Sequence, residues 1–124
     1  MSKLQITDYI ISYFFLIIID FIGMSILLKS RFNLMALDIG MTVKFNYYAV
    51  IAVYLLMLSG FFYFVDLNGK PIQAFIFGIV THGIYELTNY STIKGWRPEF
   101  VIIDTLWGGT LYTILFYFLK TFYN

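Results

Sequence analysis

The stretch "YIISYFFLIIIDFIGMSILL" (residues 9–28) decides the fold, because its 20 residues are almost all apolar. A helix rises about 1.5 Å per residue, so a segment of this length matches the roughly 30 Å hydrocarbon layer of a bilayer. Asp20 interrupts the stretch and no small-x-small cleavage motif follows it, which favours a retained span over a cleaved secretory signal. We therefore predict a membrane-spanning helix here.

The composition of the whole chain also indicates a membrane. Of its 124 residues, 60% are hydrophobic and only 12% are charged, whereas soluble domains average roughly 25% charged residues. A soluble domain of this size has too little interior to hide so much apolar surface. The net charge of +1 argues against nucleic acid as a partner, and the absence of cysteine excludes disulfides and thiolate sites. We expect membrane lipids as partners and no cofactor.

Three further apolar segments lie near residues 47–65, 72–93 and 100–119. With 9–28 they predict an all-α integral membrane protein, a bundle of four transmembrane helices that forms one domain over residues 1–124. In the short connections 66–71 and 94–99, Pro71 and Pro98 suit first helical turns. The connection 29–46 is longer and half apolar, so it is either an amphipathic or re-entrant interfacial segment or an ordinary loop.

The distribution of Lys and Arg predicts the orientation. Five of these residues lie in the first and third connections, and three lie at the other side of the predicted bundle. The five are Lys29, Arg31, Lys44, Lys94 and Arg97, and the three are Lys3, Lys70 and Lys120. The first and third connections are therefore expected on the cytoplasmic side, with both termini on the opposite side.

Three acidic residues, Asp20, Glu86 and Asp104, fall inside predicted spans. A charged side chain at this depth costs on the order of 3 kcal/mol on insertion scales, so such residues usually face a bundle interior or an aqueous cavity. Three of them in so short a chain indicate a shared polar centre.

The third predicted span has a polar half and an apolar half at 100° per residue. The polar half consists of Gly78, His82, Glu86 and Asn89 in one sector and Thr81, Tyr85, Thr88 and Thr92 in the adjoining one. The apolar half consists of Ile76, Val80, Ile84 and Leu87. The polar half is expected to face other helices, and the apolar half to face lipid.

In the fourth span, Asp104, Trp107 and Gly108 follow helical spacing, and small residues beside a carboxyl let a neighbouring backbone approach closely. Trp107 is expected to donate its indole N–H within the bundle. The residues predicted to meet in the interior are Asp20, Tyr85, Glu86, Asn89, Asp104 and Trp107. By contrast, Trp96 lies beside Lys94 and Arg97 and is predicted to be an interfacial belt residue.

Two interpretations of the three acids stay open. In one they form a proton-carrying, cation-binding or catalytic site, because clustered carboxyls share protons. In the other they are hydrogen-bonded to Tyr, Thr, Asn and Trp partners and only fasten helices together. His82 and Glu86 stand four residues apart, a spacing compatible with a metal, but a hydrogen-bonded bundle histidine is the better interpretation, and we predict no metal.

The runs "GIYELTN" (83–89) and "DTLWGGT" (104–110) resemble an uncharacterised family of small, four-span predicted membrane proteins, a domain of unknown function. Its signature is Tyr-Asp-Leu-Thr-Asn, a later tryptophan and then Asp-x-x-Trp-Gly. The positions that carry the resemblance are Tyr85, Glu86, Leu87, Thr88, Asn89, Trp96, Asp104, Trp107 and Gly108, together with Asp20, Tyr54 and Gly60. This chain has Glu86 where the family usually has Asp. It also has His82 where Tyr is common, and this second departure argues against a metal site. The resemblance implies an architecture and candidate site residues, but no activity.

The leading functional hypothesis is a small binding or transport module, working as a homo-oligomer, whose polar core handles a proton, a cation or a polar ligand. Its predicted residues are Asp20, Tyr54, His82, Tyr85, Glu86, Thr88, Asn89, Asp104 and Trp107. The alternative is a structural membrane protein, or a subunit of a larger membrane assembly, in which these residues specify packing. An intramembrane enzyme is the third class, disfavoured because no activated nucleophile is evident.

Overall fold

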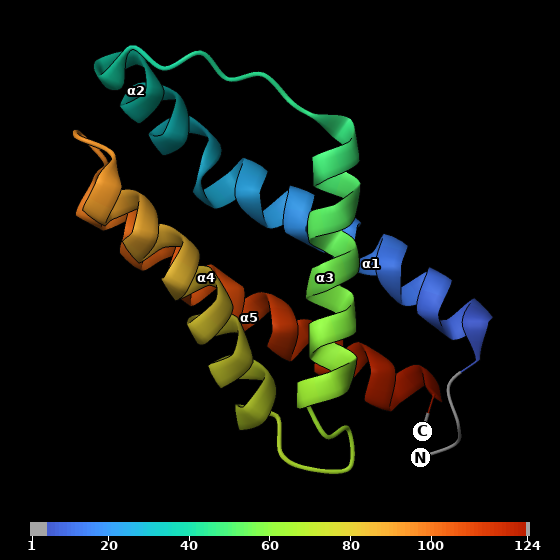
Figure 1. Cartoon of the computed structure of the whole chain (residues 1–124). Coiled ribbons are helices and arrows are strands. Elements are labelled where there is room, and N and C mark those ends of the chain that lie inside the picture. The colour runs from blue at the N-terminus through green and yellow to red at the C-terminus, as the bar shows by residue number, and fades with distance from the viewer. Residues whose placement is uncertain (1–4, 124) are drawn as a thin grey trace.

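The computed structural model describes residues 5–123, and every regular element in this part of the chain is an α-helix. The helices are α1 (Ile6–Leu27), α2 (Lys29–Ile39), α3 (Tyr47–Phe64), α4 (Ile72–Thr92) and α5 (Pro98–Tyr123) (Figure 1). The all-helical class predicted from the sequence is confirmed. Each of the four predicted spans corresponds to one long helix, namely α1, α3, α4 or α5.

Three of these helices, α1, α3 and α5, are long and apolar enough to cross a membrane. The fourth long helix, α4, is of similar length but does not reach the same apolarity, because polar residues such as His82 and Glu86 lower its mean hydropathy. Length and composition therefore support three spanning helices.

Local sequence explains where several helices begin and end. Asn46 precedes α3, and its side-chain oxygen accepts a hydrogen bond from the Ala49 amide at 3.2 Å, as expected of an N-cap. Gly40 ends α2 with a φ of 79°, and Gly95 in the α4–α5 turn has a φ of 92°. Both φ angles lie in the left-handed region that glycine adopts at low cost. These two residues therefore allow the chain to change direction sharply after α2 and between α4 and α5.

The connection between the first two predicted spans contains a helix, which agrees better with the amphipathic prediction than with an ordinary loop. This helix, α2, follows α1 after a break at Leu28. Its buried Met35 accepts a hydrogen bond from the amide of Arg97 at 3.3 Å, and Asp38 forms an ion pair with the Arg97 guanidinium. In this way α2 packs against the α4–α5 turn.

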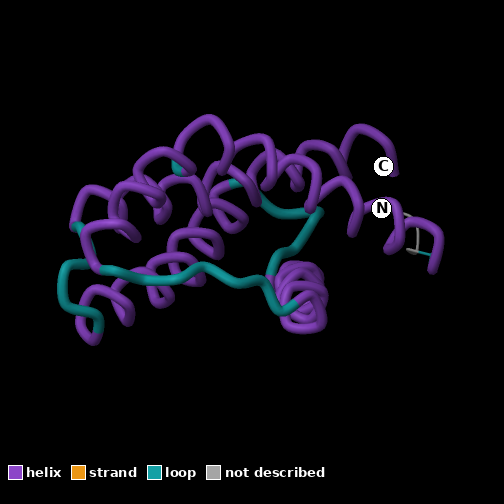
Figure 2. The backbone as a smooth tube through the Cα atoms, turned by 90° about the horizontal axis from the view of Figure 1, so that it is seen from above, coloured by secondary structure: helices purple, strands orange, loops and turns teal. Residues whose placement is uncertain are grey.

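The helices α4 and α5 form a closely packed antiparallel hairpin, with α1 running along α5 (Figure 1). A Cβ atom added at Gly78 would collide with the backbone of Gly108 and Gly109, so the two helices touch through main-chain atoms. The third long helix, α3, crosses α1 and is seen end-on to one side of the other helices in Figure 2. Phe61 of α3 stacks on Tyr112 of α5 at a centroid distance of 5.8 Å.

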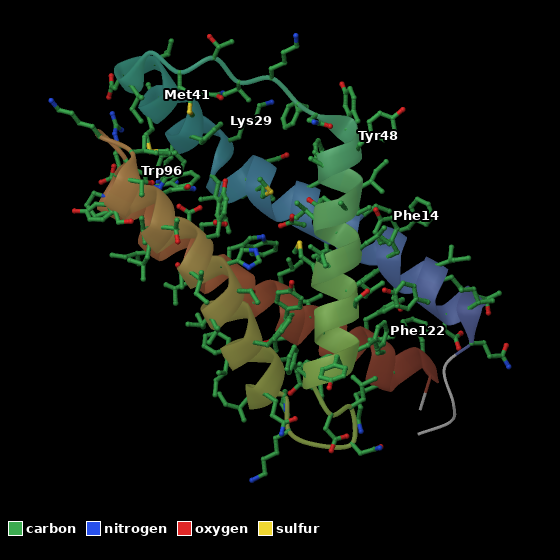
Figure 3. The ribbon with its side chains drawn as sticks, viewed as in Figure 1. Phe14, Lys29, Met41, Tyr48, Trp96 and Phe122 are labelled. Atoms are coloured by element: carbon green, nitrogen blue, oxygen red, sulfur yellow. The ribbon has the colours of Figure 1, made fainter. Side chains whose placement is uncertain are left out.

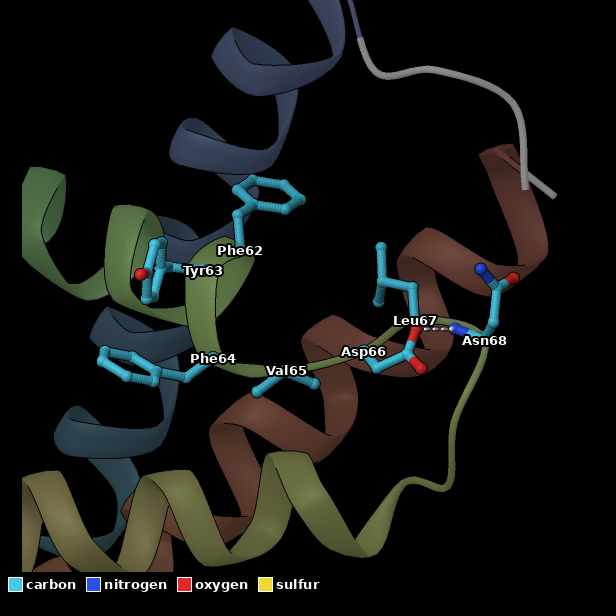
Figure 4. A pocket seen from close by; sticks show the side chains of 7 residues that line it. All are labelled: Phe62, Tyr63, Phe64, Val65, Asp66, Leu67 and Asn68. Atoms are coloured by element: carbon cyan, nitrogen blue, oxygen red, sulfur yellow. Dashed lines mark hydrogen bonds between the residues drawn. The ribbon is translucent and has the colours of Figure 1, made fainter.

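The connections alternate between the two ends of the bundle. Figure 3 places Lys29, Met41, Tyr48 and Trp96 at one end, whereas Phe122 lies toward the other. The α3–α4 loop shares the second end with the start of α1 and the end of α5 (Figure 1). A surface depression there is lined by Phe62–Asn68 (Figure 4).

Candidate functional site

Asp20 joins three helices through its two carboxyl oxygens. Its Oδ1 atom accepts a hydrogen bond of 2.8 Å from the Trp107 indole of α5, and its Oδ2 atom accepts one of 2.6 Å from the Tyr54 hydroxyl of α3. The residue is only 5% exposed. A carboxylate is a strong acceptor, so two donors from different helices both satisfy it and fix the position of α1.

The neighbouring Gly23 makes room for this arrangement. A Cβ atom at residue 23 would overlap the six-membered ring of the Trp107 indole. Because Gly23 lies three residues after Asp20, it falls on nearly the same face of α1. The glycine therefore lets the indole lie against the helix while its N–H reaches the carboxyl group.

Glu86 forms a second hydrogen-bonded group closer to the α2 end. It is 1% exposed, and its Oε1 atom accepts a hydrogen bond of 2.9 Å from the Trp96 indole. The carboxyl group of Asp104 on α5, 8% exposed, is close enough to that of Glu86 for the two to interact. Two adjacent carboxyl groups repel when both are ionised and attract when they share one proton.

The two groups form one carboxyl cluster, defined here as Asp20, Glu86 and Asp104. Asp104 is close enough to Asp20, Glu86 and His82 to interact with each of them electrostatically. Helices α1, α3 and α4 contain no Lys or Arg, and α5 contains only Lys120, in its last turn. No cationic lysine or arginine therefore neutralises the cluster from within the long helices. Burial of such acids is least costly when hydrogen bonds or bound protons compensate their charge.

His82 lies half-buried on α4, against the backbone of Gly108 on α5. Its ring meets the Tyr112 ring edge-on at 6.0 Å, and its Nδ1 atom is 3.4 Å from the Thr81 hydroxyl. Among residues 5–123, no three His, Asp or Glu side chains are arranged to hold a metal ion. The imidazole thus packs between α4 and α5.

The helical pattern of α4 places some predicted site residues outside the interior. Gly78 and Glu86 are buried and His82 and Asn89 half-buried, whereas the apolar half of α4 is exposed as expected of a lipid-facing surface. Tyr85 is 59% exposed, so its predicted place in the interior was wrong. It stands one position, or about 100°, before Glu86 and therefore points away from α5. Thr88 is also exposed, and its hydroxyl donates to the Ile84 carbonyl at 2.6 Å.

The assignment of Trp96 to an interfacial belt was wrong as well. The side chain is 7% exposed and donates to Glu86, because the short turn after α4 returns the chain beneath α2. Phe32 and Phe100 cover the indole, with ring centroids 6.4 and 5.7 Å away. The neighbouring Lys94 and Arg97 had suggested that Trp96 lies at the membrane–water interface. The one sequence signal for its contact with Glu86 is that the two residues are ten positions apart across a tight helical hairpin.

Two surface depressions of the bundle lie at helix ends. One is lined by Phe62–Asn68 and another by Asp38, Ile39 and residues 92–95. Neither is lined by an acid of the carboxyl cluster, whose three members are all buried.

Comparison with known proteins finds one family. A family model described as "Predicted membrane protein (DUF2177)" matches residues 5–118, which include every acid of the cluster and both tryptophans. No curated protein and no solved structure matches the chain significantly.

Proposed function

Because the chain belongs to this family of predicted membrane proteins of unknown function, we propose that it is a four-span module that binds and conducts protons through its carboxyl cluster. In this proposal the module works as a homo-oligomer, since one copy is small for a complete pathway and many transport folds are assembled from repeated helical units. The α2 end faces the cytoplasm, as the Lys and Arg distribution predicts.

The length and packing of α4 support its role as the fourth span. Its 21 residues give a helix of about 32 Å, which matches the hydrocarbon layer. Its polar side packs on α5, and its exposed side carries Ile76, Val80, Ile84 and Leu87. A helix that turns its polar residues toward a neighbour can cross a bilayer despite a modest mean hydropathy.

The observation that carries the functional proposal is the burial, within the long helices, of three acids that have no lysine or arginine partner among residues 5–123. Glu86 and Asp104 lie side by side, so a proton held between them would remove their mutual repulsion. A packed cluster of this kind can take up a proton without opening a cavity. Its burial disfavours larger ligands, which need a pocket.

Hydroxyl and indole groups extend from the cluster toward both ends. Trp96 separates Glu86 from the α2 end. In the other direction, Tyr54 contacts Asp20, Tyr13 donates to the Ile51 carbonyl at 3.1 Å, and Tyr9 lies 2.5 Å from the Ser59 hydroxyl. Tyrosine hydroxyls both donate and accept, so this row between α1 and α3 can relay protons once water joins it.

One observation favours the structural alternative. Both oxygens of Asp20 are occupied by donors from two other helices, which is what a packing role requires. The alternative applies to the whole cluster only if Glu86 also serves packing alone. Variants of Glu86 therefore distinguish the two functions.

Proton flux into vesicles tests the proposal. With the full chain reconstituted in liposomes containing a pH-sensitive dye, a potassium diffusion potential should drive faster pH change than in protein-free liposomes. Glu86→Gln should abolish this extra flux, because an amide cannot carry a proton in this way, while helix content and assembly stay unchanged. The matched control is Glu99→Gln, which makes the same change at an exposed residue of α5 and should keep the flux.

Two results would contradict the proposal. Wild-type flux equal to that of empty liposomes would rule out conduction. Full flux in Glu86→Gln would exclude the cluster as its route. If Glu86→Gln is tolerated and Glu86→Leu only disrupts assembly, the packing function is favoured.

A further inference from the structure

We infer that α2 and the segment 40–46 form a surface that binds the headgroups of anionic phospholipids. The two ends of the described chain differ in charge. Five cations and two anions lie at the α2 end, against two of each at the other. The α2 end holds Lys29, Arg31, Lys44, Lys94, Arg97, Asp38 and Glu99, and the other end holds Lys70, Lys120, Asp8 and Asp66.

Both acids at the α2 end are already paired with one arginine. Arg97 forms an ion pair with Asp38 and lies 3.8 Å from Glu99. Within residues 5–123 the other four cations of this end have no carboxylate partner. These four are Lys29, Arg31, Lys44 and Lys94, and all are exposed. An external anion is therefore the natural partner for them.

The apolar residues around these cations identify the kind of anion. On α2, the face toward the bundle carries Met35 and Ala36, whereas Leu34 and Leu37 are exposed on the opposite face. At 100° per residue, Lys29 and Arg31 flank this exposed strip on its two sides. Large apolar side chains with cations along their border are typical of helices that lie at a lipid surface.

The segment after α2 continues this surface toward α3. Val43 and Phe45 are exposed on either side of Lys44, and the exposed Tyr48 stands at the start of α3. Figure 3 shows Lys29, Met41 and Tyr48 at the same end of the bundle. In the proposed four-span arrangement, this end of the long helices lies at the headgroup layer. A negatively charged leaflet attracts Lys and Arg at this depth, and the exposed leucines suit the boundary between its headgroups and acyl chains.

Selectivity for spin-labelled lipids tests this inference. The full chain is reconstituted in phosphatidylcholine, and the fraction of immobilised lipid is compared for spin-labelled phosphatidylglycerol and phosphatidylcholine by electron paramagnetic resonance. We expect phosphatidylglycerol to associate with the protein more strongly than phosphatidylcholine. Each cation at the surface should raise this preference by up to about fivefold. The preference should fall as salt screens the charges.

Two double variants with the same chemistry provide the comparison. Lys29→Gln/Lys44→Gln should remove most of the preference, whereas Lys70→Gln/Lys120→Gln, at the opposite end, should leave it nearly unchanged. Circular dichroism checks that both variants keep their helices. Equal association of the two lipids with the wild type, or the same loss in both double variants, would overturn the inference, since neither result fits a surface confined to α2.

Discussion

Gly78→Ala is expected to destabilise the protein by about 3 kcal/mol or more, although it adds only one methyl group. The new Cβ would overlap the backbone of Gly108 and Gly109, and main-chain atoms cannot rotate away as a side chain can. The α4–α5 hairpin would have to separate, which weakens every contact along it. Reversible unfolding in mixed detergent micelles, followed by circular dichroism, measures the change.

Gly83→Ala is the matched control on the same helix. A Cβ atom there would meet the Thr105 side chain at 3.5 Å, an ordinary van der Waals distance. Because alanine is a better helix former than glycine by about 1 kcal/mol, this variant should be as stable as the wild type or more stable. Equal effects of the two substitutions would contradict the close backbone contact between α4 and α5.

Asp20→Leu is expected to cost about 2–4 kcal/mol of stability, because it removes the acceptor of two hydrogen bonds and leaves the donors of Tyr54 and Trp107 unpaired. Asp20→Asn should cost less, since one side-chain oxygen remains. Combination with Tyr54→Phe separates the contribution of one hydrogen bond. The double variant should be more stable than the sum of the single effects predicts by about 1 kcal/mol.

Strict additivity of Asp20→Leu and Tyr54→Phe would contradict direct coupling between the two side chains. Tyr63→Phe is a useful control, because Tyr63 is also on α3 but is exposed. It removes the same hydroxyl group and should leave stability unchanged in the wild type and in Asp20→Leu.

The positions of the long helices could be predicted from the sequence, because apolar length and flanking turn residues are local signals. The inward face of α4 could also be predicted, since Gly78, His82 and Glu86 recur with helical spacing. The contact between Asp20 and Trp107 could not be specified, because it depends on which faces of α1 and α5 meet. Nothing in the local pattern of α5 selects Gly23 of α1 as the place where the indole lies.

The errors have local physical causes. Trp96 has charged neighbours in the sequence, yet the tight α4–α5 turn and the packing of α2 bury its ring. Tyr85 lies beside Glu86 in the sequence, but successive residues of a helix differ in direction by about 100°. Polarity alone therefore assigned Tyr85 to the interior, whereas the packing of α4 on α5 decides which part of its polar half is covered.

The most direct test of the proposed proton site is pH-difference infrared spectroscopy of the protein in lipid. The wild type should show a protonated-carboxyl band that changes between about pH 5 and about pH 9. This band should disappear in Glu86→Gln or Asp104→Asn and persist in Asp20→Asn, because Glu86 and Asp104 are the adjacent pair. If all the buried acids keep one protonation state across this range, the cluster does not exchange protons and the proposed function is wrong.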